Sequence, residues 1–443
     1  MARLTREIGR QIVEHTYNQI EPEEPQDSPH YVDHDAGRYR RLTEKTPNRD
    51  VATLFGKITL HRRGYRFVNR DVNERTIFPL EMALGLVENA TPALAEVAAR
   101  AMAEAGATQG TVLARLRDEH GVSWGVRTLR AVTEHMEALM TPLRRASQVA
   151  QVVQWLEQAW KTKGKHSPTL SVGRDGITLS TRPHGFFEVA TVGTVTVYDR
   201  QGKRLGSVYL GFVPELGQQT MTDELTALIK DILKAWQGKL PRLVYLTDAG
   251  DSECGYFKIL RRLRHPRTGK RLSWQRILDF FHASQRLTIM GEALFGKNKR
   301  AAAWAARMRK VLKKPNGVFR VLHSAASLRS RRKIAKSRKK EFRTAYNFLR
   351  NRSHHMRYHQ YRTAKLPIGS GITEAACKTL FTQRLKLSGM RWSKEGAQVI
   401  LNLRAIRLSG VWKAVHRAML RSIYNVAPVT PVLEGIFNRQ NAA

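Results

Sequence analysis

The chain has 443 residues, with 76 Lys and Arg against 37 Asp and Glu, which gives a formal net charge of +39. A length above about 300 residues predicts more than one domain, and a hydrophobic content of 42% is enough for folded cores, which excludes a disordered polycation. No apolar run is long enough to span a bilayer, and the first residues lack the apolar segment of a signal peptide. We therefore expect a cytoplasmic protein with no membrane partner.

The cysteine spacing and the net charge indicate which kinds of site and partner to expect. Cys254 and Cys377 lie far apart with no CxxC spacing, which argues against a disulfide framework and against a cysteine zinc module. A protein with this net charge attracts polyanions, because each neutralised phosphate releases condensed counterions. Nucleic acid is the expected partner, but the composition does not separate binding from cutting.

Two segments are predicted before the central part of the chain. Residues 1–50 are expected to be a loosely ordered arm, because they contain an acidic stretch with several prolines. Residues 51–150 are expected to form a small domain that begins with a hairpin and continues with helices. Alternation of apolar and polar residues places the hairpin turn at Arg63 and Gly64.

A helix-turn-helix pattern lies within this small domain. The turn is expected at His120 and Gly121, and Ser123 is expected to cap the second helix. Such a helix would place Arg127 and Arg130 in a DNA major groove. Helix pairs joined by a glycine turn also occur in ordinary bundles, so the pattern leaves both interpretations open.

The pattern changes to a period of two in the next segment, residues 165–296. It predicts three strands, at 170–182, 185–199 and 203–213. A helix is expected over 220–237, followed by a buried strand that ends at Asp248. This order of strands, helix and strand is typical of an α/β fold.

Three carboxylates occupy positions where such a fold binds ligands. Asp175 lies inside the first predicted strand, although an Asp before a glycine also suits an edge or a turn. Asp248 follows the buried strand, where open α/β sheets bind ligands, or begins an ordinary turn. Glu374 begins a later helix, where it also suits the helix dipole and an ion pair with Lys378. As a set, these oxygen donors suit two Mg²⁺ (or Mn²⁺) ions.

Residues 297–365 carry 23 basic residues and one acidic residue, a net charge of +22. Apolar side chains recur at steps of three and four, which favours helices with a buried stripe over a disordered tail. Tyr358 and Tyr361 are available in this interpretation for stacking on bases. Phosphate contacts are expected from Arg331, Arg332, Lys333, Lys336, Arg338, Lys339 and Lys340.

Residues 366–415 are predicted to supply the last helices of the core, and residues 416–443 a C-terminal tail. Ser393 is expected to cap the final core helix. Further contacts with DNA are expected from Arg384, Lys386 and Arg391.

The ordered blocks of this chain resemble DDE transposases of the RNase H-like fold from bacterial insertion sequences, in particular the ISKra group. The blocks are VGRDGITLS, YLTDAGDSE, ILDFFHASQRL and LPIGSGITEAACKTLFTQRLKLSGMRWSKEGAQVILNLRA, and the resemblance covers about residues 53–410. It implies an α/β fold in which an RNase H-like mixed sheet contains a basic helical insertion. A small hairpin and helical domain of the helix-turn-helix type would precede this sheet.

The resemblance also implies roles for individual residues. Asp175, Asp248 and Glu374 correspond to the catalytic and metal-binding triad, with Asp251 a rival for the second position. Asp279 and His282 match the [C/D]xxH signature of related Mutator-like transposases and are expected to be auxiliary.

The implied activity is Mg²⁺-dependent nicking of transposon ends, followed by joining of the 3′-OH to target DNA. The implied partners are the double-stranded terminal repeats, the target DNA and at least a second copy of the chain. Two other interpretations remain: a DNA-binding or architectural protein without catalysis, and a nuclease or junction resolvase with the same fold.

Overall fold

The computed structural model describes residues 2–34, 37–68, 76–183, 187–332 and 334–426. The chain divides into two compact units, one comprising Met1–Arg144 with Asn402–Ala443 and the other Arg145–Leu401. Helices α5 (Val126–Lys161) and α15 (Lys394–Leu408) contribute residues to both units. None of the helices in the described residues combines the length and the apolar character needed to cross a membrane.

The first unit contains an antiparallel sheet of strands β1 (Tyr31–His34), β2 (Gly37–Thr53) and β3 (Gly56–Phe67). Helix α1 (Ala2–Asn18) and the short helix η1 (Pro25–Asp27) precede it. Val13 and Tyr17 of α1 pack against Val51 and Ile58 of the sheet. The prediction of a loosely ordered arm over residues 1–50 is therefore wrong, because this segment buries apolar side chains of its own.

The hairpin lies where the sequence predicts one, but its turn does not. Thr53 pairs with Gly56, and Arg63 and Gly64 lie inside β3. Arg63 is only 1% exposed, and its guanidinium donates to backbone carbonyls, including that of Glu23 at 2.8 Å. In the sequence, a buried arginine cannot be distinguished from the exposed polar residue of a turn, which explains why the turn was placed at Arg63 and Gly64.

The helices of the first unit follow the predicted order. Those that follow the sheet are α2 (Pro79–Ala83), α3 (Pro92–Met102), α4 (Gln109–His120), the beginning of α5, the end of α15, and α16 (Trp412–Val426). Gly121 ends α4 with a φ of +67°, a left-handed conformation that glycine adopts without strain. Helix α5 begins at Val126, so Ser123 does not cap it, and Arg127 and Arg130 are exposed on its first turns. The predicted tail begins inside α16, and residues 427–443 lie outside the described part.

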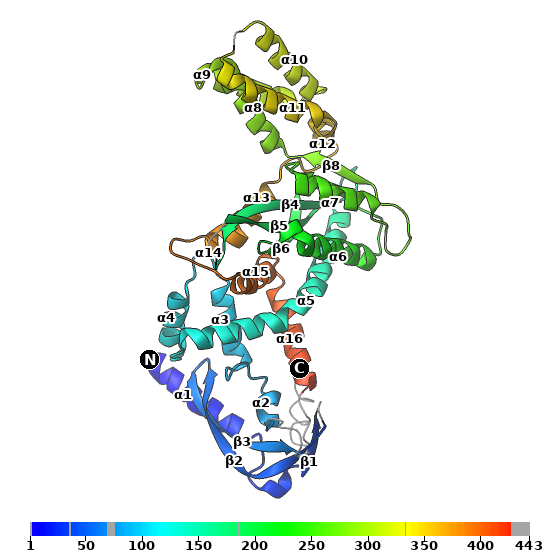
Figure 1. The fold of residues 1–443 in the computed structure, drawn as a ribbon. Coiled ribbons are helices and arrows are strands. Elements are labelled where there is room, and N and C mark those ends of the chain that lie inside the picture. Colours follow the sequence, from blue (N-terminus) through cyan, green and yellow to red (C-terminus); the bar gives the residue numbers. More distant parts are fainter. Residues whose placement is uncertain (1, 35–36, 69–75, 184–186, 333, 427–443) are drawn as a thin grey trace. The chain divides into compact units, whose positions relative to one another are not determined.

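The second unit is built on a mixed five-stranded sheet, with the order β6-β5-β4-β7-β8 (Figure 1). The strands are β4 (Thr169–Ser180), β5 (Phe187–Tyr198), β6 (Arg204–Phe212), β7 (Arg242–Thr247) and β8 (Trp274–Leu278). Strand β5 pairs antiparallel with both β4 and β6, whereas β4, β7 and β8 pair parallel with one another in that order. The α/β prediction is confirmed. Strand β8 is an addition, because the sequence pattern predicted no further strand after the one that ends at Asp248.

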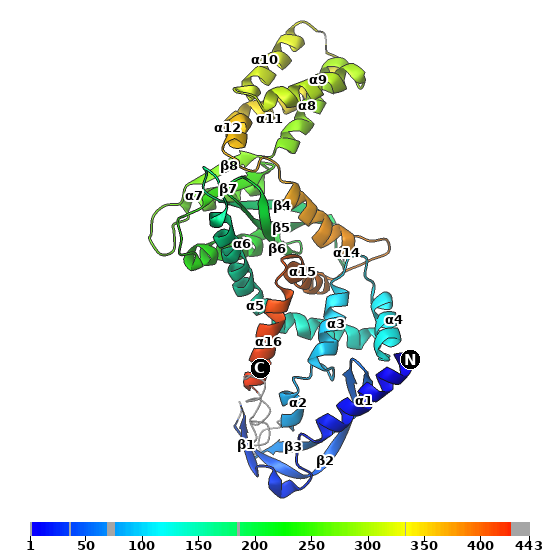
Figure 2. The same cartoon turned by 180° about the vertical axis from the view of Figure 1, so that it is seen from behind.

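Helices cover both faces of this sheet (Figure 2). One face packs on the second half of α5, on α6 (Gln219–Ala235), which follows the short helix η2 (Leu216–Gln218), and on α7 (Asp251–Arg262). The other face carries α13 (Gly371–Ala376), η4 (Cys377–Thr382), α14 (Gln383–Leu385) and α15. Ser393 accepts a hydrogen bond from Gly396 at the start of α15, as predicted for a cap.

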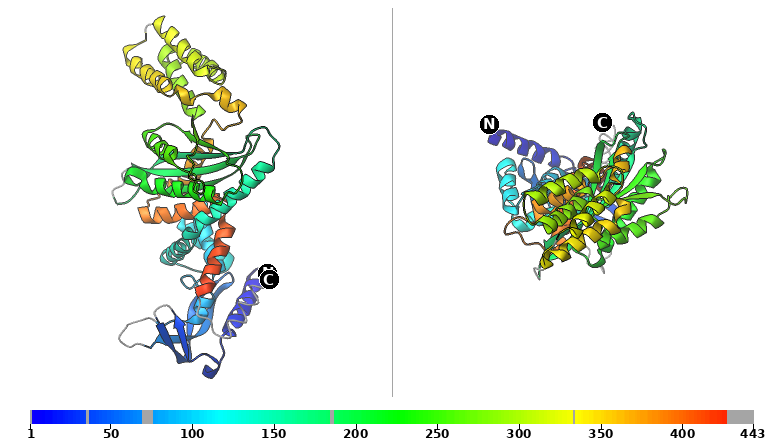
Figure 3. Two further views of the ribbon diagram at one scale, coloured as in Figure 1. Left: turned by 90° about the vertical axis from the view of Figure 1, so that its right-hand side faces the viewer. Right: turned by 90° about the horizontal axis from the view of Figure 1, so that it is seen from above.

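The basic segment, residues 297–365, is helical as predicted. It forms α9 (Lys299–Leu312), α10 (Gly317–Ser330), α11 (Lys336–Asn351), η3 (Ser353–His355) and α12 (Tyr358–Thr363). Helices α9 and α11 pack on α8 (Phe280–Phe295), as Figures 1 and 3 show. The buried stripe includes Trp304, Met308, Ile334, Phe342 and Leu349.

Tyr358 and Tyr361 belong to the same buried core, so the prediction that they stack on bases is wrong. The Tyr358 hydroxyl donates to the carbonyl of Leu278 at 2.9 Å, which satisfies its polar group inside the protein.

Candidate active site

Three aspartates lie at one level across the parallel strands. Gly173 of β4 pairs with Leu246 of β7, so Asp175 stands level with Asp248, two residues further along each strand. The same extension from β7 to β8 brings Asp279 level with Asp248, and the Asp279 N–H donates to the Thr247 carbonyl at 2.8 Å. Neighbouring strands lie about 4.8 Å apart, and side chains at one level point to one face. The register therefore gathers three carboxyl groups on one edge of the sheet, the edge at which the parallel strands have their C-terminal ends.

Burial and charge act together on the first of these carboxyl groups. Burial, together with the nearby carboxylate of Asp248, raises the pKa of Asp175 above its ordinary value. A cation between the two would relieve the repulsion that raises this pKa. The donor set thus fits a hard divalent ion.

Glu374 joins this edge through helix α13 and its continuation η4. Cys377, three residues after Glu374, directs its thiol toward Asp175 Oδ2 at 3.5 Å. Residues three apart share a helix face, so Glu374 lies on the same side of its helix as this contact. Its carboxylate Oε1 accepts from Ser370 Oγ at 3.1 Å and lies 3.7 Å from His282 Nδ1.

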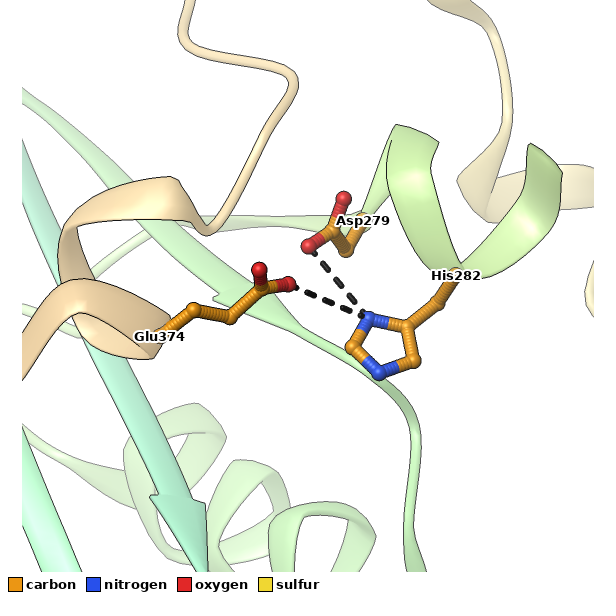
Figure 4. A group of neighbouring side chains, drawn as sticks. All are labelled: Asp279, His282 and Glu374. Carbon is orange, nitrogen blue, oxygen red and sulfur yellow. Dashed lines mark hydrogen bonds and ion pairs between the residues drawn. The ribbon is translucent and has the colours of Figure 1, made fainter. Parts of the chain in front are cut away.

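Figure 4 shows how Asp279, His282 and Glu374 meet. Their possible ligand atoms all lie within 4.8 Å of one another, and they form the group able to hold a metal ion within the described residues. Asp175 and Asp248 are not part of this tight group. His282 Nδ1 stands between the two carboxylates, 3.4 Å from Asp279 Oδ2, and this hydrogen bond raises the histidine pKa. The position therefore suits either a metal ion or a protonated imidazole.

Asp279 is more constrained than the other carboxylates. It is fully buried, and Oδ1 accepts from the Phe281 N–H at 2.6 Å, capping α8. Oδ2 accepts from both the N–H and the hydroxyl of Ser370. Burial opposes ionisation here, but the hydrogen bonds from His282, Ser370 and Phe281 prevail and lower the pKa. A carboxylate engaged in this way can position its neighbours. The auxiliary role expected of Asp279 stays a prediction.

Helix α13 docks on the sheet through a glycine. Thr373 Oγ1 lies 2.9 Å from Thr194 Oγ1 of β5, directly over Gly173 of β4. A Cβ atom at Gly173 would lie 2.8 Å from Thr194 Oγ1 and closer still to Thr373 Oγ1. The missing side chain therefore allows the helix that carries Glu374 to approach β4.

The turn after β7 is held from two directions. Ala249 has a φ of +65°, an uncommon conformation for a residue with a side chain. Inside the turn, the Gly250 N–H donates to Asp248 Oδ1 at 2.8 Å. From outside, Arg352 at the end of α11 donates to the Ala249 carbonyl at 3.3 Å. A residue of the basic segment thus helps to hold the turn that carries Asp248.

The opposite face of β4 carries a buried ion pair that sequence reasoning missed. Arg174 is buried and donates to Gln218 Oε1 at 2.7 Å, and its guanidinium lies 3.9 Å from the carboxylate of Glu253. Burial, with the charge of Asp248 next, raises the Glu253 pKa. The alternation of side chains along a strand would have placed Arg174 opposite Asp175. The side chain of Asp251, the expected rival, lies outside the described part.

Basic side chains gather beside the same turn. Arg276, Arg352, His354 and His355 lie close enough that burial, assisted by the charges of His354 and Arg276, lowers the His355 pKa to about 4. The two arginines of this group favour an anion beside them.

The predicted phosphate contacts divide into exposed and packed residues. The exposed ones are Arg331, Lys336, Lys339, Lys340, Lys386 and Arg391. Arg332 stacks on Phe295, and Arg338 donates to the Glu292 carbonyl at 3.3 Å, so both support the helices. Lys333 lies outside the described residues.

Arg384 differs from its prediction. It is 1% exposed and lies over the Trp392 ring at 4.9 Å, and burial lowers its pKa to about 10. Its guanidinium packs inside the protein and offers no surface to a phosphate.

No protein-family model matches this chain, and no curated protein matches its sequence.

Replacing Gly173 with Ala should move α13 and destabilise the fold by about 1–3 kcal/mol, because the new methyl group overlaps the stiff side chain of Thr373. The free energy of unfolding in urea measures the effect. Gly371→Ala is the matched control, since a Cβ there has nothing within 4 Å. Adding Thr373→Ala to the Gly173 variant should restore part of the loss. Equal stability of the Gly173 and Gly371 variants would contradict this account.

His355 should make the fold less stable as the pH falls from 7 to 5. Its folded pKa is lowered to about 4, so the unfolded chain takes up a proton near the ordinary pKa of 6.5 while the folded chain does not. After allowance for partial exposure, we expect a loss of about 1 kcal/mol through this group. Urea unfolding at both pH values should show a smaller pH effect in His355→Gln, and an unchanged pH effect would contradict the assignment.

Proposed function

We propose that this protein is a DDE transposase that nicks transposon ends and joins the 3′-OH to target DNA. The observation that carries the proposal is the strand register that places Asp175 level with Asp248, with the Glu374 helix docked on the same edge. The sheet order, with an antiparallel β6-β5-β4 half and a parallel β4-β7-β8 half, supports an RNase H-like core. In that interpretation residues 297–365 are a helical insertion between Asp248 and Glu374.

The residues of the candidate active site would have different roles in this reaction. Asp175, Asp248 and Glu374 would hold two Mg²⁺ (or Mn²⁺) ions, which supply activation of the attacking oxygen and stabilisation of the leaving oxygen when bound. Asp279 and Ser370 orient Glu374 and His282 through their hydrogen bonds. The hydrogen bond with Asp279 raises the His282 pKa, and a proton on Nδ1 between the two carboxylates would limit their repulsion.

The basic segment would hold the DNA backbone next to this edge. Lys336, Lys339 and Lys340 of α11 are exposed and would supply this positive charge, and Arg352 contacts the turn that carries Asp248. A synaptic complex of two or more copies would supply one active site to each transposon end.

Asp175→Asn, Asp248→Asn and Glu374→Gln should each lower Mg²⁺-dependent strand transfer by at least about a hundredfold, because each removes a charge that the ions require. DNA binding should persist in all three variants. The measurement uses a pre-cleaved 3′-OH end of the element's terminal repeat and a target plasmid. Glu395→Gln, an exposed residue in the first turn of α15, is the matched control and should behave as the wild type.

Two results of this assay would replace the proposal. DNA binding without any metal-dependent cleavage would indicate a DNA-binding or architectural protein. Cleavage without joined products would indicate a nuclease or resolvase.

Binding to duplex DNA should weaken steeply with salt, and Lys336→Gln, Lys339→Gln and Lys340→Gln together should reduce the slope of log K against log salt by about two to three. The three side chains are exposed on α11, so their loss leaves the core intact. Replacing the same lysines with arginine keeps the charge and should keep the slope. Fluorescence anisotropy at several salt concentrations measures it, and equal slopes for the Gln and Arg sets would remove α11 from the DNA interface.

A further inference from the structure

A pocket of about 340 Å³ lies in the basic segment, between the start of α10 and the chain from η3 to α12. Val318, Met356 and Tyr358 line it and are buried, which gives the pocket an apolar floor. The Tyr358 hydroxyl is already bonded to Leu278, so it is committed to the fold. The interior therefore favours an apolar or aromatic group.

The rim of the same pocket is cationic. Lys314 and Arg357 are exposed there, with His354 and His359 beside them. No Asp or Glu occurs among the lining residues in the part of the chain that the structure describes. An anionic group at the rim would therefore meet positive charge with no opposing carboxylate.

An aromatic ring completes the arrangement. Phe319, on the first turn of α10, lines the pocket and is 60% exposed, although most large apolar side chains of this segment are buried. Exposed rings beside basic side chains are the features that single-stranded nucleic acid uses for stacking and for its phosphates. Tyr358 and Tyr361, which the sequence suggested for base stacking, are buried, whereas the Phe319 ring is accessible.

We propose that this pocket takes one unpaired nucleotide of a DNA strand. Its base would lie on Phe319 and the apolar floor, and its phosphate would lie between Lys314 and Arg357. The volume is near the lower limit for ligand pockets, which suits a single nucleotide and leaves no space for a base pair. This inference rests on the proposed DNA-binding function, and it adds a preference for DNA with an unpaired end over fully paired DNA.

The test compares the full chain on a blunt duplex and on the same duplex with a three-nucleotide thymine overhang, by anisotropy at fixed salt. The wild type should bind the overhang duplex about tenfold more tightly, which is the scale of one stacked base. Phe319→Ala should abolish this preference without changing affinity for the blunt duplex, since it removes no charge.

Two double variants distinguish binding in the pocket from non-specific electrostatic attraction of DNA. Lys314→Gln with Arg357→Gln removes two exposed cations at the rim, and Arg320→Gln with Arg343→Gln removes two exposed cations outside the pocket. Both should weaken binding to the blunt duplex similarly, but only the first should lose the preference for the overhang. Permanganate oxidation of the overhang thymines provides a second readout, because a base in the pocket is protected.

Three outcomes would overturn the inference: equal binding of both duplexes by the wild type, a preference that survives Phe319→Ala, or equal loss of preference in both charge variants. Pocket-dependent binding of free thymidine monophosphate without any overhang preference would also overturn the assignment to a DNA strand. Failure here with intact blunt-duplex binding and strand transfer leaves the proposed transposase function standing. Failure of strand transfer with an intact overhang preference would remove that function and retain the pocket.

Discussion

The parallel register of β4, β7 and β8 is the constraint on which the candidate site depends. It places Asp175, Asp248 and Asp279 at one level, although 73 and 31 positions separate them along the chain. A slip of one residue in any strand would turn its aspartate to the other face, where Arg174 and Glu253 now pair. The apolar residues that fill both faces of these strands resist such a slip, so packing far from the carboxylates also maintains their geometry.

A second constraint joins the sheet to the helix that carries Glu374. Ser370 bonds both Asp279 and Glu374, and Thr373 rests over Gly173, so the first turn of α13 is held at two points. Asp279 is buried with hydrogen bonds to both oxygens, and a buried carboxylate is tolerated only under that condition. Asp279 and Ser370 are therefore part of the framework that holds the helix carrying Glu374.

Sequence patterns predicted most of the regular structure of the second unit, because its strands and helices differ clearly in period. Strands β4, β5 and β6, helix α6 and strand β7 all occur where alternation and helical spacing place them. Strand β8 was missed because it is short, interrupted by Arg276, and continuous with a helical pattern. Arg63, Arg384 and Tyr358 were misjudged for one reason: they are buried and contact groups inside the protein, which composition and spacing do not reveal. Asp279 and His282 are three residues apart and belong to one sequence pattern, but the approach of Glu374 depends on the register of β8 and on Ser370, which no local pattern indicates.

The bond from Arg352 to the Ala249 carbonyl makes the basic segment and the acidic edge mechanically dependent on each other. Ala249 keeps a backbone conformation that its side chain disfavours, and its carbonyl also accepts from the weakly donating thiol of Cys254, at 3.7 Å. A phosphate that drew Arg352 away would leave the Ala249 carbonyl with the Cys254 thiol as a weak donor. Binding of DNA to the basic segment would then change the position of Asp248, because the Arg352 guanidinium belongs to this segment and contacts the turn that carries Asp248.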